Sequence, residues 1–147
     1  MNKIVTFLFA LVFSTAAANA ITILTFGGTG YITQNREYVL TTKLPEYTVN
    51  VNNNVTEYVR KKHVEFTFIG KATYWSLSIA APNGEDLKVG TYANVARYGF
   101  QDINQAGLDL SGDGRGHNTL TGSVKIKAVE WDSNGKLIKF EADFQQF

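Results

Sequence analysis

A glycine-rich segment, residues 107–122, carries the side chains whose types and spacing could do chemistry. Five polar residues lie close together within it: Asp109, Asp113, Arg115, His117 and Asn118. Glycine allows backbone amides to approach a ligand closely, so these residues form a candidate binding loop. The alternative is a structural connection, in which the glycines permit tight turns and the aspartates cap them.

Calcium is the ion whose loop pattern this segment partly matches. Asp109, Ser111 and Asp113 have the spacing that opens an EF-hand loop, but the twelfth position, which should be a bidentate Glu, is Leu120. Neither histidine has the spacing of a zinc motif. We therefore expect no metal and no cofactor, with calcium kept as the weaker alternative.

Catalysis has little support in the sequence. The chain has no cysteine and no G-x-S-x-G motif. Asp109 and Asp113 could act as paired carboxylates on a glycan, although they lie four positions apart on a glycine-rich segment. The sequence thus leans against an enzyme. The alternative is a small secreted hydrolase of a glycan or peptide, which needs a carboxyl group of raised pKa in a cleft, from Asp109, Asp113 or Glu141.

The first twenty residues have the pattern of a signal peptide. Lys3 is followed by the apolar run 4–13, and small residues then lead to the cleavage pattern Ala18-Asn19-Ala20. The apolar run is too short for a membrane-spanning helix. The sequence predicts a signal peptide over 1–20 and one domain over 21–147, exported to the periplasm or beyond, with no integral membrane segment after cleavage.

The charge balance excludes some partners. Without Lys3, the chain has equal numbers of basic and acidic residues, which argues against nucleic acid as a partner. The short basic run 60–62 precedes His63, and we expect it at a solvated turn or strand end. An unknown protein or a glycan of the cell envelope or exterior remains as the partner.

Apolar and polar residues alternate along much of the chain, as in strands with one buried face. The apolar positions of the clearest segments are Val64, Phe66 and Phe68; Trp75, Leu77 and Ile79; Val124 and Ile126; Ile138, Phe140, Ala142 and Phe144. Turn signals occur about every ten residues. The pattern predicts an all-β fold, a single antiparallel β-sandwich of about seven to nine strands, with a small barrel as the alternative.

Turn residues and aromatic residues refine this prediction. Asn83-Gly84, Gly70-Lys71 and Ser133-Asn134-Gly135 are expected to end or join strands. Trp75 is expected in the core. Tyr74, its neighbour on the strand, is then expected to point outward, and Tyr92 is a further candidate for an exposed aromatic that could stack on a sugar.

The run from Gly114 to Gly122, Gly-Arg-Gly-His-Asn-Thr-Leu-Thr-Gly, resembles a motif of a family of secreted bacterial β-domains, Gly-Arg-Gly-Cys-Asn-x-Leu-x-Gly. The flanks that agree with that family are Gly90-Thr91-Tyr92, Arg97-Tyr98-Gly99-Phe100 and the ending Ala142-Asp143-Phe144-Gln145-Gln146. The family has no established activity, so the resemblance implies a fold and export rather than a function.

This chain departs from the family where its members carry cysteines. His117 stands at the position of the first cysteine, and the second, just after the Asp-Phe-x-Gln stretch, is absent. The disulfide that the resemblance implies is therefore missing here. Altogether the sequence predicts an exported, non-enzymatic binding or structural domain. A hydrolase and a subunit of a surface assembly, joined through an exposed strand edge, are the alternatives.

Overall fold

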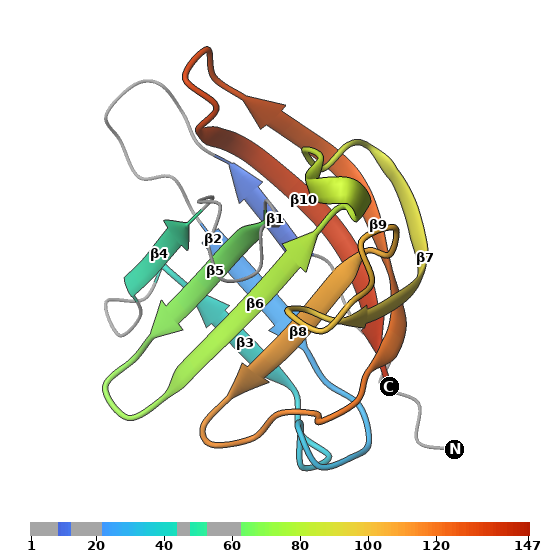
Figure 1. The fold of residues 1–147 in the computed structure, drawn as a ribbon. Coiled ribbons are helices and arrows are strands. Elements are labelled where there is room, and N and C mark those ends of the chain that lie inside the picture. The colour runs from blue at the N-terminus through green and yellow to red at the C-terminus, as the bar shows by residue number, and fades with distance from the viewer. Residues whose placement is uncertain (1–8, 13–21, 44–47, 53–62) are drawn as a thin grey trace.

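The computed structural model describes residues 9–12, 22–43, 48–52 and 63–147, and their regular structure is almost entirely β (Figure 1). The strands are β1 (Phe9–Val12), β2 (Thr22–Phe26), β3 (Tyr38–Thr41), β4 (Thr48–Asn52), β5 (Val64–Ile69), β6 (Tyr74–Ala80), β7 (Gly90–Arg97), β8 (Gly107–Gly112), β9 (Thr121–Trp131) and β10 (Leu137–Gln146). One 3-10 turn, Pro82–Gly84, follows β6. The all-β prediction is confirmed.

The strands form one curled sheet in the order β3-β2-β1-β10-β9-β7-β8-β6-β5-β4. Its continuous centre runs from β10 to β5, and the β2–β3 hairpin is joined to it through β1. Neighbouring strands are antiparallel except β7 and β8, which are parallel where Ala96 faces Gly107 and Arg97 faces Leu108. The parallel pair arises because the connection 98–106 returns the chain to the same end of the sheet before β8 starts.

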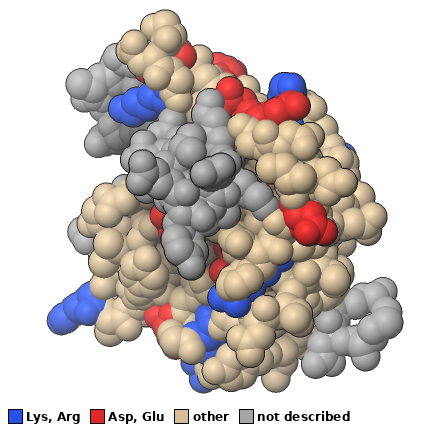
Figure 2. All heavy atoms as spheres, viewed as in Figure 1, with Lys and Arg blue, Asp and Glu red and all other residues tan. Residues whose placement is uncertain are grey.

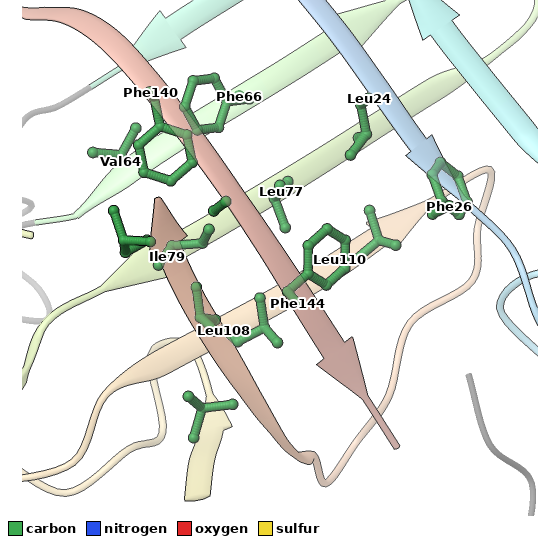
Figure 3. Close-up of a cluster of buried hydrophobic side chains, with 14 of the residues drawn as sticks. Leu24, Phe26, Val64, Phe66, Leu77, Ile79, Leu108, Leu110, Phe140 and Phe144 are labelled. Atoms are coloured by element: carbon green, nitrogen blue, oxygen red, sulfur yellow. The ribbon is translucent and has the colours of Figure 1, made fainter. Parts of the chain in front are cut away.

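The curl folds the sheet over itself into two layers, as in a sandwich or half-barrel. In Figure 1, β1, β2 and β10 cross β5, β6 and β8, and the long strands β9 and β7 bend round one side. The core lies between the layers (Figure 3). The rings of Phe66 on β5 and Phe140 on β10 are 5.1 Å apart, and those of Phe26 on β2 and Trp75 on β6 are 4.5 Å apart. Burial of these side chains on both layers is the main force that closes the fold.

The turn signals lie where the sequence predicts them. Gly70 donates to the carbonyl of Thr73 in the β5–β6 hairpin, and Asp132 and Lys136 close the β9–β10 hairpin around Gly135. Asn83 and Gly84 both have positive φ and lie in the turn that follows the end of β6. Asparagine and glycine tolerate this region of φ better than other residues.

A bulge changes which residues of β10 are buried. The alternation predicts Ile138 in the core, but Leu137 is the buried residue, with 1 % of its surface exposed. The register of β10 on β9 shifts between Leu137 and Lys139, which reverses the alternation at that point. Beyond the shift, Phe140, Ala142 and Phe144 are buried as predicted.

The basic run 60–62 and most of the predicted signal peptide lie outside the described residues. Of the predicted signal peptide, only residues 9–12 are described, and they form β1, paired with β10 on one side and β2 on the other.

We expect Phe140→Ala to lower the free energy of unfolding by about 3–5 kcal/mol, because the ring is fully buried between the layers and its loss leaves a cavity. Val39→Ala is the control, since Val39 lies on β3 with 57 % of its surface exposed, and should change stability by less than about 0.5 kcal/mol. Urea denaturation measures both values. An equal, small effect of the two changes would contradict the two-layer core.

Candidate functional site

Arg115, in the connection between β8 and β9, lies in an aromatic pocket. Its guanidinium is 5.0 Å from the ring of Trp75 and 5.8 Å from the ring of Tyr38, within cation–π range. Nη1 donates to the carbonyl of Ile32 (2.7 Å) and to the hydroxyl of Tyr38 (3.1 Å). Nη2 lies 3.3 Å from Oδ2 of Asp113. Arg115 therefore ties the glycine-rich loop to the connection between β2 and β3.

The local sequence accounts for this geometry. A Cβ on Gly112 would clash with the Trp75 ring and with the carbonyl of Tyr74, so only glycine allows β8 to pass this close to β6. Asp113 and Gly114 have positive φ and reverse the chain, so that Gly112 and Arg115 exchange backbone hydrogen bonds. The Asp113 carboxylate also accepts from the backbone amide of Tyr74 at 2.9 Å. The turn is thus held by its own side chains.

His117, further along the same loop, is hydrogen-bonded to the last strand. Gln146, 1 % exposed, accepts from the amide of Leu110 and donates to its carbonyl, which fixes the orientation of the side-chain amide. Its remaining N–H points to Nδ1 of His117 at 3.1 Å, so that nitrogen acts as the acceptor. This hydrogen bond links the glycine-rich loop to β10.

Burial lowers the pKa of His117 below its ordinary value of 6.5. The hydrogen bond acts in the same direction, because protonation of Nδ1 would bring two donors together. The folded protein therefore favours the neutral ring.

Asp109 lies apart from the loop, on β8. Its Oδ2 is 3.9 Å from Nε of Arg97 on β7, and Ser78 is its register partner on β6. Burial raises the pKa of Asp109, while the positive charge of Arg97 opposes that shift. Oδ1 of Asp109 and Nε of Arg97 are buried without a hydrogen-bond partner among the described residues.

The structure does not bring the five candidate residues together. Asp113 and Arg115 pair with each other, and His117 faces Gln146 instead. Asp109 lies within β8 beside Arg97, whereas Asp113 lies in the turn that follows that strand. Asn118 is exposed. Within the described part of the chain, no group of three or more His, Asp or Glu side chains could hold a metal ion.

The remaining predicted residues divide between surface and interior. Tyr74 is 50 % exposed and Trp75 is fully buried, as the strand alternation predicts. Glu141 lies 3.8 Å from Nζ of Lys127. His63, which directly precedes β5, is buried: it is 4 % exposed and stacks on Tyr98, with ring centroids 4.7 Å apart.

A surface hollow of about 380 Å³ lies between β7 and the connection 98–106. Its lining residues are Pro82, Tyr92, Ala93, Asn94, Asp102, Asn104, Gln105 and Ala106. A bulge in β7 at Asn94, whose φ is +56°, breaks the register with β9 and bends the strand beside the hollow. Gln105 braces the bulge by donating to the carbonyl of Asn94 at 2.8 Å.

Of the residues that line this hollow, the sequence indicated only Tyr92. Two signals could have indicated it. Asparagine is unfavourable inside a strand, so Asn94 marks an irregularity in an otherwise regular segment. The run 101–105 combines amides and a carboxylate with an apolar residue, Ile103, which is 62 % exposed.

On the face in Figure 2, acidic and basic side chains are scattered among uncharged residues. No helix in the described ranges has the length and apolar character needed to cross a membrane. Comparison of the chain with protein-family models, curated proteins and solved structures finds no match.

We expect Arg115→Met to lower the free energy of unfolding by about 2–4 kcal/mol, because it leaves the Ile32 carbonyl and the Tyr38 hydroxyl without their donor. Arg36→Met, an exposed arginine in the same β2–β3 connection, is the matched control. Chemical denaturation gives both values. Equal stability of the two variants would show that the Arg115 contacts contribute nothing.

The lowered pKa of His117 predicts that stability falls as the pH drops below about 6.5. In that range the unfolded chain takes up a proton that the folded protein resists, so acid favours unfolding until the folded pKa is passed. His117→Gln should reduce the difference in melting temperature between pH 7.5 and pH 5. An unchanged pH profile in this variant would contradict the assignment.

Proposed function

We propose that this protein is an exported, non-enzymatic binding domain whose ligand is a glycan of the cell envelope or exterior. The proposal of export rests on the signal-peptide pattern of residues 1–20. The proposal of binding rests on one observation, the hollow beside the Asn94 bulge.

The chemistry of the hollow suits a neutral, hydroxyl-rich ligand. Asn94, Asn104 and Gln105 offer amide donors and acceptors, and Asp102 offers a carboxylate acceptor. Tyr92 contributes an aromatic ring, and its hydroxyl is already engaged with the backbone amide of Lys88 at 3.0 Å. Amphipathic rings beside planar polar groups provide both apolar contact and orienting hydrogen bonds.

The glycine-rich loop supports a structural role better than a binding role. The side chains of Asp113 and Arg115 are already committed to each other, to Tyr38 and to backbone groups. Of the predicted binding residues in this loop, Asp113 and Asn118 are exposed, and the carboxylate of Asp113 already has partners.

Hydrolysis has less support than binding. A glycosidase needs two carboxyl groups on either side of one bond. Asp109 has the raised pKa that such a role requires, but it pairs with Arg97, while Asp113 pairs with Arg115 and Glu141 with Lys127.

The processed protein should be screened on an array of defined envelope and plant oligosaccharides, and the bound sugar then titrated in solution. We expect Asn104→Ala, in the hollow, to weaken binding by about three- to tenfold through the loss of one or two hydrogen bonds. Asn118→Ala, the same change on the glycine-rich loop, is the matched control and should bind as wild type.

Each other outcome decides against part of the proposal. Weaker binding by Asn118→Ala alone would move the site to the glycine-rich loop. No binding to any oligosaccharide, with protein partners captured instead, would contradict a glycan ligand. Release of shorter products from the bound sugar would favour the hydrolase.

A further inference from the structure

The place of β1 in the sheet conflicts with the expected fate of its residues. β1 lies between β10 and β2, and therefore inside the sheet order rather than at its edge. Its residues, Phe9–Val12, belong to the segment whose pattern predicts removal during export. A processed chain that begins at Ile21 would start directly before β2 and would lack this strand.

Without β1, a vacant position would lie between β10 and β2, which we call its two walls. Contacts that do not involve β1 hold each wall. On one side, β10 pairs with β9 along its other edge, and Phe140 packs on Phe66. On the other side, β2 pairs with β3, and the ring of Phe26 stacks on Tyr38 at 4.7 Å.

The Arg115 contacts hold the second wall in position. Arg115 binds the carbonyl of Ile32 and the hydroxyl of Tyr38, and so fixes the β2–β3 hairpin to the β8–β9 loop. Neighbouring strands lie about 4.8 Å apart, so the backbones of β10 and β2, two spacings apart, are separated by about 9.6 Å. Loss of β1 would leave room there for one strand.

The register of β1 shows what fits the gap. Along the stretch of β10 that pairs with β1, the buried residues Phe140 and Ala142 alternate with the partly exposed residues Lys139 and Glu141. Paired residues on adjacent strands share a face of the sheet. An occupant therefore needs an extended backbone and apolar residues at alternate positions.

We propose that the processed protein binds, between β10 and β2, an extended segment of a partner protein with apolar residues at alternate positions. The added strand would restore the backbone hydrogen bonds along both walls, and its apolar side would complete the core. This interaction rests on the proposed export and processing, but it lies apart from the hollow at Asn94.

The test uses the exported protein after intact-mass confirmation that it begins at Ile21. The probe is a synthetic peptide of residues 6–13 with added lysines for solubility. We expect one peptide per protein, with amide exchange slowed at least tenfold at residues 139–142 and 22–23. The same peptide with Leu11→Pro is the matched control and should bind at least tenfold more weakly, because proline removes a backbone donor.

The full-length chain, refolded with residues 1–20 retained, should not bind the peptide because β1 already occupies the position between β10 and β2. Failure of the processed protein to bind, with residues 139–142 already protected in a monomer, would overturn the proposal by showing that β2 and β10 close directly. Concentration-dependent protection in a dimer would overturn it in favour of a second copy.

An intact mass that retains residues 1–20 would refute processing, and with it the vacant position. The sugar titration would still decide the binding function.

Discussion

The insertion of the Arg115 guanidinium among Trp75, Tyr38 and the Ile32 carbonyl is the polar contact that links the two layers of the described fold. It joins three parts that are distant in sequence: the β2–β3 hairpin, the start of β6 and the β8–β9 loop. A charged group in such a place is tolerated because its donors are matched and the aromatic rings receive the positive charge. The same contact explains why the loop is rich in glycine, since Gly112 and Gly114 allow the chain to reach the pocket.

The fold could be predicted from the sequence because alternation is a local property. Side chains on a strand point to opposite faces whatever the topology, so Phe66, Trp75 and Phe144 were recognisable as core residues. The parallel contact of β7 with β8 and the shift at Leu137 could not be predicted in this way. Both depend on how distant strands meet, and alternation carries no information about that.

The candidate site was harder to predict for the same reason. The spacing of Asp109, Asp113 and Arg115 drew attention to a ligand loop, yet spacing along a chain does not show which side chains already have partners. Two of the groups that accept hydrogen bonds from Arg115 lie more than seventy positions away in the sequence. His63 follows a basic run and still stacks on Tyr98, because the strand that begins next to it carries it into the interior. Residues of the Asn94 hollow, by contrast, are brought together by a bulge and a crossover connection.

The proposed recognition site and the contacts that stabilise the two layers lie in different parts of the fold. The glycine-rich loop stabilises the two layers, and the hollow beside β7 offers polar groups and an aromatic ring to a ligand. The most direct test is a two-dimensional NMR titration of the processed, isotope-labelled protein with an oligosaccharide that it binds. This account predicts that amide shifts concentrate at residues 92–94 and 102–106, with residues 113–119 unchanged. Shifts centred on residues 113–119 would contradict it and return the site to the glycine-rich loop.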